Sequence, residues 1–244
     1  MKTIINTTAD GSHTLYAPTF GENYHSMHGA QQESEHIFIN AGFGNCPKSE
    51  ILVFEVGLGT GLNAALTLAA AERLQKRVDY KAIELFPLAR KSISQLNYFE
   101  KNIYRKYFEK IHQIAWNERV AITDFFYLTK IKADFTTFEC NFGFDVCYFD
   151  AFSPDTQPAM WSKSRFEMLY CAANQDAALT TYCAKGQVRR DMQAAGFDVE
   201  RLPGPPGKRE FLRATKSTIY LSQKQYSDLT VRNEKISEIP AEKS

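Results

Sequence analysis

The sequence predicts an α/β fold in which one doubly wound, mainly parallel sheet is covered by helices. Apolar, strand-like runs alternate with helical patterns from residue 51 onward, and this alternation is typical of the fold class. The chain has 244 residues, of which 44% are hydrophobic, enough for one sizeable core and too short for two comfortable domains. The run 144–152 is apolar enough for burial on both faces, as in a central parallel strand.

The first half of the sheet is predicted from consecutive segments. The apolar run 51–56 indicates a central strand, and the Ala/Leu repeats of 62–74 indicate the helix that follows it. Segment 80–85 is expected to be a second strand, with Pro87 in the first turn of the next helix, where a missing N–H costs little. Segment 120–124 is expected to be a third strand.

The second half begins with the fourth strand, 144–152. Segment 176–183 is expected to be the fifth strand, followed by a helix over 186–197 that ends with Gly196 as its C-cap. Segments 198–202 and 210–217 are expected to complete the sheet.

The two ends of the chain lack this alternation of strand and helix patterns. Residues 10–45 look like an irregular N-terminal extension with a short hairpin near 13–26. The sequence therefore predicts an extension, hairpin and lid over 1–45 and one domain over 46–226. A polar C-terminal tail follows over 227–244, where there is little to bury.

Composition limits the kind of partner. The net charge is +1, from 29 basic and 28 acidic residues, so a nucleic acid would have to be held by a local basic patch. The five cysteines form no C-x-x-C pair, which favours reduced thiols over a disulfide framework. No apolar run has the length of a signal peptide core or a membrane span, so a cytoplasmic protein is expected.

The turn after the first central strand predicts a cofactor. Glu55 is followed by Gly57, Gly59 and Gly61, and in an α/β sheet this turn lies at the ligand crevice. Glycines let the backbone approach a ligand, but the spacing is G-x-G-x-G rather than the G-x-G-x-x-G of dinucleotide sites. Glu55 would repel a pyrophosphate, whereas it suits the ammonium and sulfonium of S-adenosylmethionine (SAM). A tight turn without a ligand is the alternative.

Two further acids support this interpretation. Glu84 is expected to close the second strand, from which a carboxylate reaches ribose hydroxyls. Asp124 is expected to close the third, where a carboxylate can accept a hydrogen bond from an adenine amino group. Either acid could instead be a turn or cap residue, but together with Glu55 they predict SAM as the cofactor.

The fourth strand ends in a stretch that suggests the reacting group. Asp150 follows this strand, next to Phe152 and Pro154, and Trp161 lies further along the same loop. A carboxylate in an aromatic pocket can hold the N–H groups of an amine and aim its lone pair at a methyl group. The alternative is that Asp150 caps the turn at Ser153.

Other side chains carry weaker signals. His25 and His28 have i, i+3 spacing, but no third ligand is evident, so no metal site is predicted and the segment is interpreted as a lid. Lys208 and Arg209 lie in a Gly/Pro loop and could bind phosphate together with other basic residues, namely Lys185, Arg189, Arg190 and Arg213.

Several blocks in this order resemble the methyltransferase half of the MnmC family, which includes the stand-alone form called MnmD. They span most of residues 10–215 and are DGSHTLYAPTFGENYHSMHGA, EVGLGTGLN, IELFPL, YFDAFSPDTQPAMW, TYCAKGQVRRDMQAAGF and GPPGKRE. The resemblance implies a class I, Rossmann-like fold of SAM-dependent methyltransferases. It also implies N-methylation of the aminomethyl group on a wobble uridine in the anticodon loop of tRNA, giving the methylaminomethyl, usually 2-thio, form.

The resemblance also assigns roles to residues. Asp150 is implied to be catalytic. The implied cofactor-binding residues are Glu55, Gly57, Gly59, Gly61, Asn63, Glu84, Asp124 and Asp150, and the implied substrate-binding residues are His25, Phe152, Trp161, Tyr182, Lys208 and Arg209.

The chain departs from the family pattern in two ways. Leu58 stands where phenylalanine is commoner. No FAD-dependent oxidoreductase half is expected, so a separate enzyme could supply the aminomethyl precursor.

Two other functions stay open at this point. One is a SAM-dependent N-methyltransferase that acts on a small amine, with an enclosed pocket and no affinity for tRNA. The other is a SAM- or RNA-binding protein without catalysis, against which the glycine turn and Asp150 argue.

Overall fold

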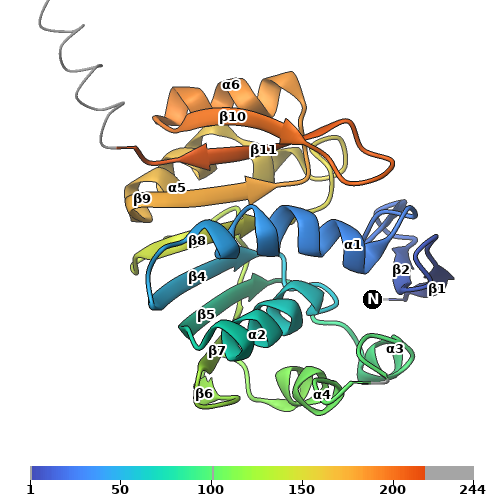
Figure 1. Cartoon of the computed structure of the whole chain (residues 1–244). Helices are drawn as coiled ribbons and strands as arrows, with labels where there is room; N and C mark the ends of the chain where they lie inside the picture. The colour runs from blue at the N-terminus through green and yellow to red at the C-terminus, as the bar shows by residue number, and fades with distance from the viewer. Residues whose placement is uncertain (1, 101, 218–244) are drawn as a thin grey trace, which may run out of the picture.

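The computed structural model describes residues 2–100 and 102–217, and its centre is an eight-stranded sheet. The strand order is β10-β11-β9-β8-β4-β5-β7-β6 (Figure 1). The strands are β4 (Glu50–Val56), β5 (Arg77–Glu84), β6 (Arg119–Ala121), β7 (Phe126–Lys132), β8 (Phe144–Phe149), β9 (Ala173–Thr181), β10 (Asp198–Pro203) and β11 (Glu210–Thr215). The strands from β7 to β9 are parallel, and β6, β10 and β11 run antiparallel at the two ends. The order reverses between β4 and β8, which makes this position the topological switch point.

Helices cover both faces of the sheet, as the sequence predicts. One face is covered by α1 (Ala30–Ser34), its π-helical continuation (Glu35–Asn40), α2 (Leu62–Leu74) and α4 (Arg105–Gln113). The other is covered by α5 (Lys163–Ala172) and α6 (Gly186–Ala195), which lie side by side (Figure 1). The central strand β8 is buried along its whole length and sends Tyr148 into one core and Phe149 into the other. Short helices complete the chain at Phe43–Asn45, α3 (Arg90–Ser94) and Pro158–Trp161.

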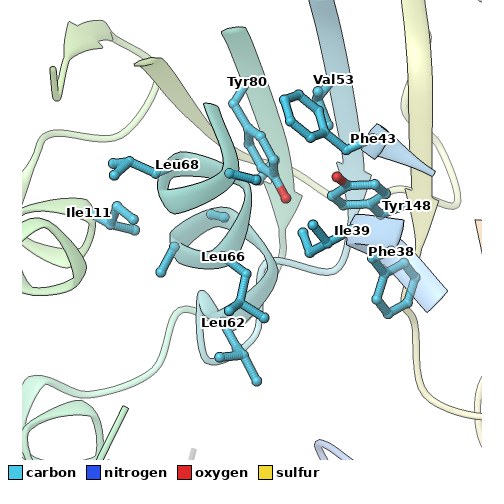
Figure 2. Packing of buried hydrophobic residues seen from close by; sticks show 14 of the residues in the cluster. Phe38, Ile39, Phe43, Val53, Leu62, Leu66, Leu68, Tyr80, Ile111 and Tyr148 are labelled. Carbon is cyan, nitrogen blue, oxygen red and sulfur yellow. The ribbon is translucent and has the colours of Figure 1, made fainter. Parts of the chain in front are cut away.

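The N-terminal segment is more regular than predicted. β1 (Ile4–Thr7), β2 (His13–Ala17) and β3 (Glu22–Asn23) form a small antiparallel sheet, which contains the predicted hairpin. The helix that follows is part of the main core: Phe38 packs against Tyr148 with ring centroids 5.3 Å apart, and Phe43 is fully buried (Figure 2). The expectation of an irregular extension is therefore wrong for residues 30–45, because their apolar side chains are needed to cover the sheet.

The predicted elements after residue 50 are mostly confirmed. α2 has the predicted bounds, and α6 ends at Gly196, which adopts the left-handed conformation of a C-cap. Pro87 is not in the first turn of a helix, since α3 begins only at Arg90 after an extended Ala89. The predicted tail, 227–244, lies outside the described residues. Within the described part of the chain, no helix is both long and apolar enough to cross a membrane.

The third strand requires a correction that matters for the site. The strand within 120–124 is β6, a short antiparallel edge strand, and the parallel third strand is β7, which the sequence analysis missed. Asp124 is exposed in the turn before β7, so it lies at the amino end of the parallel strands, opposite the glycine turn. The predicted role of Asp124 with adenine is therefore wrong.

Candidate active site

A cavity of about 700 Å³ lies at the carboxyl ends of the central strands. Its walls come from the ends of β4, β5, β7 and β8, from the loop after β9 and from the N-terminal segment 20–27. Among the predicted site residues, those that line it are Gly57, Gly59, Glu84, Asp150, His25, Phe152, Tyr182 and Lys208. The volume is within the range that accommodates a cofactor-sized ligand.

The glycine turn packs tightly against its neighbours. Gly57 has a φ of +94°, and a Cβ placed there would lie 2.6 Å from the carbonyl oxygen of Asp150. Glu84 braces the turn from β5, because its Oε2 accepts the N–H of Gly59 at 3.0 Å and its Oε1 accepts the N–H of Phe86 at 2.8 Å. Only glycine allows Asp150 to approach the turn this closely.

Asp150 is held at the switch point by two hydrogen bonds. Its backbone N–H donates to the carbonyl of Val56 at 2.9 Å, and its Oδ2 accepts from the Asn63 amide at 2.8 Å. Burial and the nearby charge of Glu33 raise the pKa of Asp150 to about 7, although the Asn63 hydrogen bond and Lys208 act in the opposite direction. The carboxyl group can therefore exchange a proton near neutral pH.

Aromatic side chains form the walls beside Asp150. Phe152 packs against Phe20 and Tyr24 with ring centroids 4.7 and 5.0 Å apart. The hydroxyl of Tyr182 donates to the carbonyl of Ala151 at 2.9 Å, which fixes the ring next to the loop. The walls beside Asp150 are therefore aromatic and held in place by contacts of their own.

Lys208 reaches the cavity, although not as a free phosphate ligand. Its Nζ lies 2.6 Å from Glu33 Oε1 and 4.6 Å from the centre of the Tyr182 ring. The neighbouring Arg209 is exposed and does not line the cavity. The two basic residues thus face different surroundings, one in the cavity wall and one at the surface.

His25 belongs to the wall through hydrogen bonds. Its Nε2 lies 3.2 Å from Thr60 Oγ1 in the glycine turn, and its Nδ1 lies 3.2 Å from Thr14 Oγ1 in β2. Burial lowers its pKa to about 4, so the ring is neutral at physiological pH. Among residues 2–100 and 102–217, no group of three His, Cys, Asp or Glu side chains is arranged to hold a metal ion.

Four predicted site residues lie behind the cavity wall. Glu55 and Asn63 are buried beneath the glycine turn, where the Asn63 amide donates to Glu55, and neither residue lines the cavity. Gly61 begins α2 and packs against the ring of His112. Trp161 donates from Nε1 to the carbonyl of Phe152 at 2.7 Å and supports that loop.

Four ionisable wall residues were missed in the sequence analysis: Glu22, Tyr24, Glu33 and Asp134. Asp134 follows β7 at the carboxyl edge, the position assigned wrongly to Asp124. The signal for it was the alternating segment 126–132, which a buried lysine obscured. The other three lie in the N-terminal segment, where only folding could show their place.

Residues 94–217, about half of the chain, match the family model Methyltransf_30, which describes S-adenosyl-L-methionine-dependent methyltransferases. The chain belongs to this family. SAM is therefore its cofactor.

The methyltransferase is also similar to curated proteins and solved structures. It is 27% identical over 231 residues to the tRNA 5-methylaminomethyl-2-thiouridine biosynthesis bifunctional protein MnmC of Cupriavidus metallidurans, covering 86% of this chain and 34% of that protein. It is 29% identical over 232 residues to the protein of the same name from Pseudoalteromonas atlantica, covering 85% of this chain and 32% of that protein. The chain spans about a third of the length of these relatives.

Among solved structures, MnmC2 of Aquifex aeolicus superposes with a TM-score of 0.71 at 25% identity, covering 88% of this chain and 70% of that one. Spermidine synthase of Thermotoga maritima superposes with a TM-score of 0.53 at 12% identity, which shows a shared fold alone. The methyltransferase fold predicted from the sequence is confirmed.

The cavity suits SAM in charge as well as in size. Besides two tyrosines and a neutral histidine, its ionisable wall residues are five acids and one lysine: Glu22, Glu33, Glu84, Asp134, Asp150 and Lys208. An excess of carboxylates favours a ligand that carries an ammonium and a sulfonium.

Proposed function

We propose that this methyltransferase transfers the methyl group of SAM to the aminomethyl nitrogen of a modified wobble uridine in tRNA, giving the methylaminomethyl form. The observation that carries the proposal is Asp150, a buried carboxyl group between the glycine turn and two aromatic walls. The names of the MnmC relatives, which this chain matches over most of its length, support the choice of tRNA as substrate.

The cofactor is held, in this proposal, by the wall at the ends of β4, β5 and β7. Gly57 and Gly59 let the backbone approach it, Glu84 faces the ribose, and Asp134 takes the place predicted for Asp124. SAM supplies, when bound, an electrophilic methyl group on a positively charged sulfur.

Asp150 prepares the amine. An alkyl ammonium has its pKa near ~10 and no free lone pair, so a proton must leave before the nitrogen can react. The Asp150 carboxylate accepts that proton, later releases it to solvent, and holds the remaining N–H groups so that the lone pair faces the methyl group. Since its pKa is raised to about 7, the carboxylate form grows as pH rises through 7, and we expect the transfer rate to rise with it.

The base enters the cavity from a splayed anticodon loop. Phe152 and Tyr182 stack on it, and removal of water between them strengthens the interaction of the amine with Asp150. Exposed basic residues near the loop after β10, such as Arg209, contact phosphates.

The proposal is tested by incubating the purified protein with SAM and tRNA that carries the aminomethyl group, followed by nucleoside mass spectrometry. We expect methylaminomethyl-uridine, no change in a carboxymethylaminomethyl substrate, and no product with Asp150→Asn, although calorimetry shows SAM binding intact. Asp155→Asn is the matched control, because Asp155 lies in the same loop, is exposed and pairs with Lys185. Methylation of a small alkyl amine but not of tRNA would contradict the proposal.

A further inference from the structure

A buried polar cluster lies directly beneath the cavity floor. The Asn63 amide nitrogen donates to two carboxyl groups at once, to Glu55 Oε1 at 3.0 Å and to Asp150 Oδ2 at 2.8 Å. Glu55 is 0% exposed and Asn63 is 2% exposed. Both amide hydrogens are therefore used, and the two acids are linked through one side chain.

Glu55 has no cation to balance a charge. In the described part of the chain, the titratable groups that face it are acids and phenols, with one thiol: Asp150, Glu84, Tyr80, Tyr148 and Cys147. Its Oε2 is buried without a close hydrogen-bond partner, and the hydroxyl of Tyr80, which faces the carboxyl group, acts to lower its pKa. An ionised carboxylate at such a place would be strongly unfavourable, and burial together with the charge of Asp150 raises the pKa of Glu55 well above its usual value. Burial and the surrounding acids therefore favour the protonated, neutral form of Glu55.

Asn63 is fixed on its other side by the core. Thr67 donates to the backbone carbonyl of Asn63 at 2.7 Å, and the Thr67 hydroxyl lies 3.1 Å from that of Tyr148. The side-chain Oδ1 of Asn63 is buried without a hydrogen-bond partner, so the two N–H bonds alone orient the amide. Tyr148 and Tyr80 stand beside α2 in the same core (Figure 2). The amide nitrogen of Asn63 depends on Glu55 for its second acceptor, so the orientation of the amide depends on Glu55.

We propose that Glu55 is a positioning residue, a neutral acid that fixes the Asn63 amide and through it the carboxylate of Asp150. The proposal rests on the proposed function, in which Asp150 receives the amine. It replaces the role suggested by the sequence, a carboxylate that faces the cofactor directly.

Glu55→Gln and Glu55→Ala separate the two roles. Glutamine keeps an acceptor oxygen for Asn63 without a charge, so this variant should retain kcat within about threefold, whereas alanine should lower kcat about 10- to 100-fold, the usual effect of losing an outer-shell partner. The SAM dissociation constant should stay within about threefold in both variants, since neither changes the cavity wall. Glu72→Ala is the matched control, because Glu72 lies on the same helix as Asn63 and also has a buried oxygen without a partner.

A second measurement does not depend on activity. We would follow the Asp150 carboxyl resonance by carbon NMR during a pH titration, assigned with Asp150→Asn. If Glu55 is neutral, Glu55→Gln should move the titration midpoint by less than about half a unit, whereas removal of a neighbouring negative charge should lower it by about one unit or more.

Two results would overturn the proposal: a lowered midpoint in Glu55→Gln, or a loss of SAM affinity in that variant. Failure of the wild-type protein to methylate tRNA would instead contradict the proposed function, and the titration would still decide the state of Glu55. Should Glu55→Ala not fold, Glu55→Gln and the titration carry the test.

Discussion

The carboxyl groups in the cavity wall have different pKa values because their surroundings differ. Hydrogen bonds from Ser153 and Thr156 outweigh the burial of Glu22 and lower its pKa, so it stays ionised and ties the N-terminal segment to the loop after β8. Asp150 has fewer donors and a pKa of about 7, which suits proton exchange. At the residue scale, the balance between burial and hydrogen-bond donors sets the pKa of each carboxyl group.

Glu84 provides a prediction at this scale. Its carboxyl group accepts two backbone N–H groups, one of them from Gly59, so it both shapes the turn and faces the cavity. We expect Glu84→Ala to weaken SAM binding about 10- to 100-fold, as the loss of a buried acceptor costs about 1.5–3 kcal/mol. Calorimetric titration with SAM measures this, with Glu118→Ala, at the exposed surface, as control. An unchanged dissociation constant would remove Glu84 from the cofactor site.

At the scale of elements, the β4–α2 turn is held from two sides. His25 of the N-terminal segment lies against the Thr60 hydroxyl, and His112 of α4 has its Nε2 3.0 Å from the Thr60 carbonyl. Lys130 of β7 in turn donates to the carbonyl of His112 at 3.2 Å. The turn therefore depends on elements that are distant in the sequence.

The close approach of the turn to β8 predicts a large effect of Gly57→Ala. The new Cβ would meet the Asp150 carbonyl at 2.6 Å at a φ of +94°, so we expect a loss of about 2 kcal/mol or more in unfolding free energy and loss of methyl transfer. Gly11→Ala is the matched control, because Gly11 has a φ of +81° and nothing within 4 Å of the added Cβ. Urea denaturation of both variants measures the difference, and equal losses would argue against the contact.

His25 and His112 have pKa values that burial lowers to about 4, which predicts that the folded state loses stability in acid. Burial and then the charge of Lys130 lower the pKa of His112 to about 4, so the unfolded chain takes up a proton first as pH falls below 6.5. Folding stability is therefore lost as pH falls from 6.5 towards 4, by about 2 kcal/mol at pH 5 for this residue.

Comparing unfolding free energies at pH 7.5 and pH 5 tests this. His112→Gln, which keeps a donor for Thr60, should lose less stability between the two pH values than the wild type does. The exposed His28→Gln should behave like the wild type. If His112→Gln has the wild-type pH dependence, His112 does not titrate as described.

For the whole molecule, the N-terminal segment and the sheet share one hydrophobic core, so we expect them to unfold together. Phe38 and Phe43 lie in the core near Val53 of β4 and Tyr148 of β8 (Figure 2), and Ile37 belongs to the same core. Residues 22–27 line the cavity. Folding of this segment therefore completes both the core and the site.

Phe38→Ala tests this coupling. The side chain is 2% exposed, so its removal should cost about 3–5 kcal/mol of unfolding free energy. All spectroscopic probes should unfold together. Ile4→Ala, at an exposed position in the same segment, should have little effect. Independent unfolding of residues 1–45 would show instead a separate extension.

Local sequence patterns predicted most of the strands and helices after residue 50 and part of the candidate site. The β4–α2 unit was found because an apolar run and the Ala/Leu repeats of the helix are each clear signals. Asp150 was found because it follows a strand of mainly apolar residues. β7 was missed because Lys130, at 1% exposure, occupies a core-facing position where the alternation requires an apolar residue.

The sequence by itself determined the fold class, the cofactor and the residues at the ends of β4, β5 and β8, since these depend on short-range patterns and on one rule of sheet topology. Only the tertiary structure decided that Asp134 rather than Asp124 lies in the cavity wall, that Lys208 pairs with Glu33, and that Glu55 lies behind the wall with Asn63 between it and Asp150. The physical reason is that the burial and partners of a carboxyl group are set by side chains far away in the sequence, and no local pattern records them.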